Sequence, residues 1–252
     1  MKYHKKTSVA KLRRYYVIKS LPMDVHIAQN SAVVRLQNFV NASERQEIMD
    51  VVAKSQLPAY TSNYEEDLNS EGDPIHTTMY LQTDDIFERE LHWLFKRLLT
   101  HIRNINQVKA WGFDIGARSS FNVRVAEYHE MFVGGLLSDS HHYDIGSLIT
   151  VDIMLEEAVE GALFQTLEAA PQNCKIVDRK QESDNGENSE ILLQHEFHAG
   201  DAIVFVSHKY HCVSQLIKGR RKVLVVEFWS GKKRTCGHRC DNPTKSCSFV
   251  AE

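Results

Sequence analysis

His142 and Asp144 stand two positions apart in the stretch "SHHYDIGSLITV", residues 140–151, just before a run that alternates like a β-strand. Side chains at positions i and i+2 of a strand point to the same face, so an imidazole and a carboxylate placed in this way can bind one metal ion from one side. A surface histidine with an acid nearby gives the same pattern and is the commoner explanation. The pair gains meaning only if another part of the chain supplies a further ligand.

A second histidine and an arginine stand in "GDAIVFVSHKYHCVSQLIKGRRKVLVVEFW", residues 200–229. The segment predicts a strand, then His211, and then another strand that starts near Arg221. Two imidazoles and one carboxylate leave three positions of an octahedral ion open, which suits a non-haem Fe(II) that must also bind a co-substrate and oxygen. The guanidinium of Arg221 matches a carboxylate with two parallel hydrogen bonds.

Together, His142-Tyr143-Asp144, His211 and Arg221 resemble the signature of the Fe(II)/2-oxoglutarate-dependent dioxygenase superfamily, in particular its prolyl 4-hydroxylase-like branch. The segment "RVAEYHEMFVGG" resembles a strand and Gly-Gly turn of that branch. "EGALFQTLE" resembles its Gly-Gly-x-Phe turn, with Gly161-Ala162 where two glycines are common. The resemblance covers residues 118–230. Arg220 adjoins Arg221, and the ten-residue spacing from His211 matches the family for Arg221.

The resemblance implies one cavity that holds a metal and a co-substrate. Fe(II) is expected on His142, Asp144 and His211, which are also the expected catalytic residues. The co-substrate 2-oxoglutarate is expected to chelate the metal and to pair its distal carboxylate with Arg221. Succinate and CO2 would form as a C–H bond of a peptide or small molecule is hydroxylated with O2, and ascorbate is a further reagent that the resemblance suggests.

Two more residues are expected to contact the co-substrate. Tyr128 lies upstream of the Gly-Gly turn, where the branch often has a tyrosine in this role, although an ordinary half-buried strand tyrosine fits equally well. Thr150 belongs to one phase of the following strand, and it lines the cavity if that phase faces inward. The two phases are Leu148, Thr150, Asp152 and Met154 on one side, and Ile149, Val151, Ile153 and Leu155 on the other.

The elements that must position these residues are mostly short strands. Four segments after Trp111 alternate with period two: "SFNVRVAEY", "GSLITVDIML", "DAIVFVS" and "KVLVVEFW". The resemblance implies a double-stranded β-helix, or jelly roll, supported by N-terminal helices, hence an α+β, mainly β fold. A strand is expected near residues 32–36 and another at 76–82. A helix is expected after Ser43, with Gln46 completing a capping box, and a long helix from Asp84 to Gln107.

These patterns divide the chain into four parts. We expect a basic N-terminal arm (1–30), a helical and mixed support region (31–117), the dioxygenase core (118–230) and a cysteine-containing C-terminal tail (231–252). The tail holds Cys236, His238, Cys240 and Cys247, which can form a tetrahedral zinc site, a disulfide or free thiols. Free thiols are the commonest outcome for such a cluster.

Composition limits the function further. The 252 residues carry a net charge of −3, which argues against nucleic acid as a partner, and no apolar run approaches the roughly 20 residues that span a bilayer. Five cysteines and no secretory signal favour a reducing, cytoplasmic location, with organelle targeting by the basic arm left open. The expected partners are 2-oxoglutarate and an unidentified peptide or small-molecule substrate. A jelly roll that binds metal or ligand without turnover is the alternative function.

Overall fold

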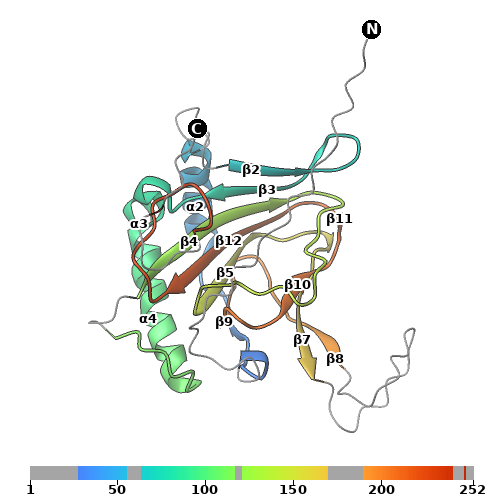
Figure 1. Ribbon diagram of the computed structural model, residues 1–252. Coiled ribbons are helices and arrows are strands. Elements are labelled where there is room, and N and C mark those ends of the chain that lie inside the picture. Colours follow the sequence, from blue (N-terminus) through green and yellow to red (C-terminus); the bar gives the residue numbers. More distant parts are fainter. Residues whose placement is uncertain (1–27, 56–63, 117–120, 170–189, 241–246, 248–252) are drawn as a thin grey trace.

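A computed structural model of the chain describes residues 28–55, 64–116, 121–169, 190–240 and 247 (Figure 1). Most of the expected basic arm and much of the cysteine-containing tail lie outside these ranges. Within them, no helix combines the length and the apolar character that crossing a membrane requires.

The largest element is a seven-stranded antiparallel sheet with the strand order β1-β9-β5-β12-β4-β3-β2. Its middle strands come from the segments that alternate in the sequence. Both faces of the sheet are covered, so most residues of β5 and β9 are buried whichever face they point to. The strands are β1 (Val34–Leu36), β2 (Tyr64–Leu68), β3 (Pro74–Tyr80), β4 (Asn122–Met131), β5 (Ile149–Glu156), β9 (Ala202–Val206) and β12 (Arg221–Trp229).

Five short strands form two smaller sheets, with the orders β10-β7-β8 and β11-β6. The first lies against one face of the large sheet, and together they make the double-stranded β-helix that the resemblance implies (Figure 1). The mainly β fold with few helices is therefore confirmed. The bounds are β6 (Glu160–Gly161), β7 (Phe164–Ala169), β8 (Glu190–Gln194), β10 (His211–Val213) and β11 (Leu216–Lys218).

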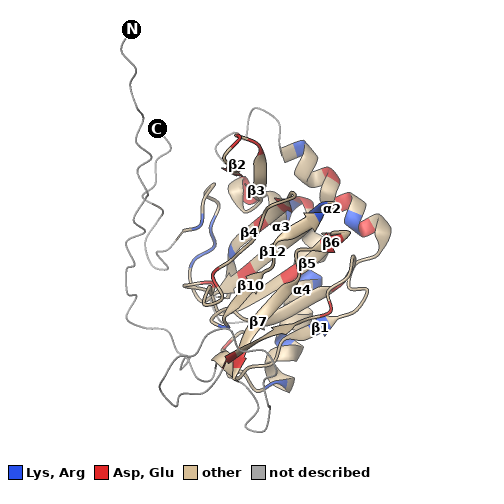
Figure 2. Cartoon of the chain, turned by 90° about the vertical axis from the view of Figure 1, so that its right-hand side faces the viewer, with Lys and Arg blue, Asp and Glu red and all other residues tan. Residues whose placement is uncertain are grey.

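The helices cover the other face of the large sheet (Figure 1). They are α2 (Ala42–Ser55), the 3₁₀ turn η2 (Thr83–Asp85), α3 (Ile86–Glu90) and α4 (His92–Val108). In Figure 2, α2 carries acidic and basic residues, whereas the strands in the middle of the sheet are mostly uncharged. This contrast is typical of an amphipathic helix over a buried sheet.

Two local expectations for the helices were wrong in detail. The capping box of α2 is Asn41 with Glu44, since each backbone N–H bonds the other's side chain at 3.0 and 2.9 Å. The expected box at Ser43 and Gln46 lies two residues too late in the sequence. The long helix is interrupted at Leu91, where φ is −116° and ψ is 38°. The apolar stripe did not reveal this break because Leu91 is buried as the stripe predicts.

The two faces of the large sheet differ in chemistry. Leu224 of β12 pairs with Ile153 and Tyr128, and all three belong to the core packed against the helices. Val225, the next residue, pairs with Asp152 and Glu127 on the opposite face. Strand alternation thus separates an apolar face from one that carries charged groups.

The helix-facing core predicts a first experiment. Leu98 on α4 is fully buried, so Leu98→Ala removes buried methyl groups and leaves a cavity. We expect it to lower the free energy of unfolding by about 2–5 kcal/mol, measured by urea denaturation. Val108→Ala at the exposed end of the same helix is the control and should change stability by less than about 0.5 kcal/mol. Equal effects of the two substitutions would contradict this packing.

Candidate metal centre

His142, Asp144 and His211 come together as a group that could hold a metal. One ligand atom from each residue lies within 4.8 Å of the others. His211 begins β10, as a neighbouring strand was expected to supply it. His142 and Asp144, in contrast, lie in the loop between β4 and β5 and not on a strand, so the argument from strand geometry was wrong for this pair although its conclusion holds.

The two imidazoles present their Nε2 atoms to the carboxylate. These atoms lie 3.5 Å (His142) and 4.0 Å (His211) from oxygens of Asp144. The Nδ1–H of His211 donates to the carbonyl of Lys209 at 2.9 Å, which leaves Nε2 as the free ligand atom. Burial lowers the pKa of His211, and a neutral ring is the form that binds metal.

Asp144 is buried and ionised. Burial alone would raise its pKa, but the interactions with His211, His142 and the guanidinium of Arg239 hold the pKa well below its usual range. The Thr150 hydroxyl donates to Oδ2 at 2.7 Å, and a guanidinium nitrogen of Arg239 lies 3.3 Å from Oδ1. Ligating carboxylates are commonly oriented by such hydrogen bonds. The structure therefore places Thr150 beside the metal group, while its expected contact with a co-substrate stays a prediction.

Arg221 is the candidate partner for a co-substrate carboxylate. It is buried, and its Nε and Nη2 make no hydrogen bond to any residue that the structure describes. Its guanidinium lies over the ring of Phe197, with 5.9 Å to the ring centroid. Arg220, by contrast, is exposed and pairs with Glu130 at 3.2 Å. Two buried guanidinium nitrogens without a hydrogen bond from the described residues call for an anion, so the geometry favours Arg221 over its neighbour.

Asp152 lies between these two parts of the site. On β5 it shares a face with Thr150, which bonds Asp144, and with Met154, which pairs with Val223 near Arg221. Its Oδ1 has no hydrogen-bond partner among the described residues. Burial raises the pKa of Asp152 to about 8, and the negative charge of Asp144 adds to the shift. A carboxyl group that holds its proton near neutral pH can donate a hydrogen bond to a ligand.

Tyr128 does not belong to this site. It pairs with Leu224 of β12, whose side chain points to the face opposite to that of Arg221 and Val223. Tyr128 therefore lies on the helix-facing side of the sheet. Its expected contact with the co-substrate is therefore not supported, and the alternative of an ordinary buried strand tyrosine describes it. The strand position alone could not decide this because one residue of register reverses the face.

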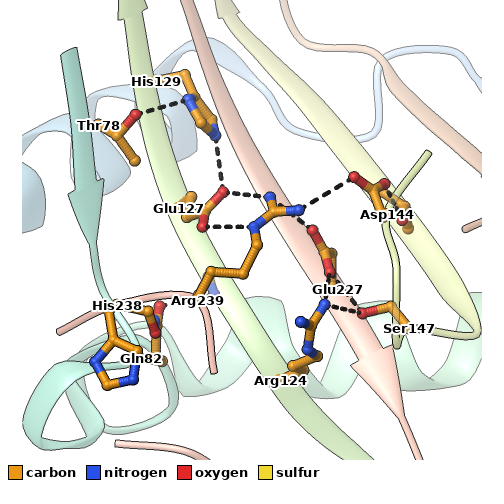
Figure 3. A network of polar contacts seen from close by, with 12 residues as sticks. Thr78, Gln82, Arg124, Glu127, His129, Asp144, Ser147, Glu227, His238 and Arg239 are labelled. Atoms are coloured by element: carbon orange, nitrogen blue, oxygen red, sulfur yellow. Dashed lines mark hydrogen bonds and ion pairs between the residues drawn. The ribbon is translucent and has the colours of Figure 1, made fainter. Parts of the chain in front are cut away.

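A buried ionic network joins the metal group to other strands (Figure 3). Arg239 pairs with Glu127 at 2.7 Å, Glu227 at 2.8 Å and Asp144 at 3.3 Å. Arg124 pairs with Glu227 at 3.0 Å. Burial opposes the ionisation of Glu127, but Arg239, assisted by His129, lowers its pKa to about 2. The network brings charges of both signs together around buried carboxylates, while the side chain of Arg239 itself is 32% exposed.

Sequence reasoning missed Glu127, Glu227, Arg124 and Arg239. Glu227 has a visible signal, since it is the one acid of β12 and stands in the apolar run "VLVVEFW". Glu127 has a weaker signal, because β4 also carries Arg124, His129 and Glu130. A charge at such a position must be paired when the strand is buried. Arg239 has no signal of this kind, because it stands in an irregular segment rich in polar residues.

Comparison with solved structures supports the fold. No family model matches the sequence, and no curated protein matches it. A 2OG-Fe(II) oxygenase family oxidoreductase from Burkholderia pseudomallei matches with a TM-score of 0.52 and 16% identity, over 84% of this chain and 92% of that one. A viral collagen prolyl hydroxylase of Paramecium bursaria Chlorella virus-1, in complex with 2OG, gives 0.50 and 12%, over 82% and 99%. The chain has the fold of these oxygenases. A Trichoplax adhaerens prolyl hydroxylase bound to a hypoxia inducible factor peptide also matches, with a TM-score of 0.50 and 12% identity over 82% and 87%.

The raised pKa of Asp152 predicts a pH-dependent stability. Because its pKa moves from an ordinary 3.8 to about 8 on folding, its contribution is complete at acid pH and is lost as the pH rises through this interval. Asp152→Asn cannot ionise, so between about pH 5 and about pH 8 the metal-free parent should lose on the order of a few kcal/mol relative to this variant. Urea denaturation of both proteins at each pH measures the difference. Parallel pH profiles would show that Asp152 is ionised in the folded protein.

Proposed function

We propose that this protein is an Fe(II)- and 2-oxoglutarate-dependent dioxygenase that hydroxylates a C–H bond and releases succinate and CO2. The observation that carries the proposal is one side of a β-helix with two histidines, an aspartate and a buried arginine whose Nε and Nη2 have no hydrogen-bond partner among the described residues. Two imidazoles and one carboxylate fit Fe(II) and leave positions free for other ligands. The Nε and Nη2 atoms of Arg221 fit the second carboxylate of a dicarboxylic co-substrate.

The residues of the chain bind and orient in this scheme. His142, Asp144 and His211 would hold the metal, with Thr150 fixing one carboxylate oxygen of Asp144. Burial lowers the pKa of Arg221 to about 10, so it stays charged near neutral pH and can bind a carboxylate with its Nε and Nη2 atoms. The metal and 2-oxoglutarate supply the oxidative chemistry when bound.

A peptide containing proline is our first candidate for the prime substrate. Two of the similar structures are described as a collagen prolyl hydroxylase and a prolyl hydroxylase bound to a peptide, which are facts about those proteins. At 12% identity they support the shape of the site more than its specificity. Small-molecule substrates therefore belong in the same screen, with succinate release as the readout.

Loss of a metal ligand should abolish turnover. Purified protein with Fe(II), ascorbate and 2-oxoglutarate should release succinate slowly without a prime substrate. We expect His142→Ala and His211→Ala to reduce this release to background, because each removes one of three ligands.

His141→Ala is the matched control for the metal ligands. His141 adjoins His142, but its side chain is exposed and lies 3.6 Å from Glu190, so the variant should keep the parental rate. Equal turnover of the parent and both ligand variants would show that the triad is not the metal site. A parent that binds Fe(II) and 2-oxoglutarate without releasing succinate, with or without substrates, would instead identify a binding protein.

Arg221 should control the affinity for 2-oxoglutarate. Removing one partner of a buried charged pair costs about 3–5 kcal/mol, so Arg221→Ala should raise the KM for 2-oxoglutarate on the order of 100-fold or more. Arg220→Ala removes a neighbouring arginine that is exposed, and should leave this KM near the parental value. A larger effect at Arg220 would move the co-substrate site to the other face of β12.

A further inference from the structure

A second group of metal-binding side chains lies in the C-terminal segment. One ligand atom from each of Cys236, His238, Cys240 and Cys247 lies within 4.8 Å of the other three. The Sγ of Cys247 is 3.2 Å from Nε2 of His238. With Zn–S near 2.3 Å and Zn–N near 2.0 Å, neighbouring ligands of a tetrahedral site lie roughly 3.5–4 Å apart. The four atoms need only small movements to reach this geometry.

The structure assigns this group as a closed zinc site, distinct from the triad. Four protein ligands fill a tetrahedral ion completely, which is typical of a structural site, whereas catalytic zinc keeps one position open. Three thiolates and one imidazole select Zn²⁺ over the harder cations that carboxylates prefer. The assignment does not depend on the proposed oxygenase activity.

The backbone of the segment is held in place independently of any metal. The side-chain amide of Gln82 donates to the carbonyls of Cys236 and His238 at 3.1 and 3.2 Å, and accepts from the backbone N–H of Ala126. The guanidinium of Arg124 donates to the carbonyl of Cys240 at 2.9 Å. Three of the four ligands are thus carried by a turn that is fixed to the sheet, and a site of this kind loses little entropy when it binds an ion.

A disulfide explains the group less well. It would join two sulfurs and leave the third thiol and the imidazole without a role. The four described cysteines, including Cys212 outside the group, are all unpaired. The convergence of an imidazole with three thiols is what a metal requires and a disulfide does not.

The site also has a structural consequence for the metal centre. Arg239 stands between His238 and Cys240, yet its side chain reaches Glu127, Glu227 and Asp144 (Figure 3). An ion on the four ligands would therefore add to the contacts that already hold the turn from which Arg239 reaches the network. The link joins the C-terminal segment to a ligand of the proposed iron.

Metal content tests the assignment directly. The full chain, expressed without a metal-binding tag and purified under reducing conditions, should carry one zinc ion per chain, measured by inductively coupled plasma mass spectrometry. Cys236→Ser, Cys240→Ser and Cys247→Ser should each lose most of it. Cys212→Ser is the control, since Cys212 is buried on β10 outside the group, and it should keep the zinc.

Two further measurements remain informative if the serine variants fold poorly. His238→Cys preserves a four-ligand site and should keep zinc in a folded protein. Co(II) bound to the parent should give the strong visible bands of tetrahedral cobalt and the charge-transfer bands of thiolate ligands. His142→Ala should leave these bands unchanged but lower the amount of iron that the protein binds. A parent that contains no zinc and takes up neither Zn²⁺ nor Co(II), or one with a disulfide among the three cysteines, would overturn the assignment.

Discussion

The neutralisation of three buried carboxylates is the constraint on which the centre of this protein depends. Asp144, Glu127 and Glu227 are almost fully buried on one side of the large sheet. Like charges in a medium of low dielectric constant repel strongly, so the arrangement is stable only with cations among them. Arg239 contacts all three acids, and Arg124 is a second cation that pairs with Glu227. Replacing such a buried ionic cluster by apolar residues of the same volume is often neutral or stabilising, so the network by itself is weak evidence for a gain in stability.

Strand alternation allows such a polar centre to exist next to a large apolar core. Neighbouring residues of β4, β5 and β12 point to opposite faces, and the helix-facing set is apolar throughout the contact with α4. The other face holds a smaller apolar cluster, which includes Met154, Phe205 and Val223, beside the charged groups of the site. The metal ligands add a further separation, since His142 and Asp144 lie on a loop and only His211 lies on a strand.

The sequence predicted the parts of the site that depend on residue type and on period-two patterns. It singled out His142, Asp144 and His211 from ligand chemistry and from the resemblance, although the first two lie on a loop and not on the expected strand. For β5 it separated the two phases but left open which of them faces the site. It could not place Tyr128, since the face of a strand follows from pairing register. The sequence also did not decide whether the cysteines of the tail bind zinc, form a disulfide or stay free. The approach of Cys247 to His238 occurs within an irregular segment, where no periodic pattern predicts contacts.

Three acids surround Arg239, although one carboxylate would balance its charge. The position of the guanidinium next to the proposed metal centre offers a reason. A cation on Asp144, His142 and His211 draws on the same carboxylate that Arg239 contacts, so the two compete for Asp144. The distances to Glu127 and Glu227 are shorter, at 2.7 and 2.8 Å against 3.3 Å. Those two acids would therefore hold the guanidinium if a metal ion bound to Asp144. Arg239 can stay in place in both states and continue to orient the carboxylate through its weakest contact.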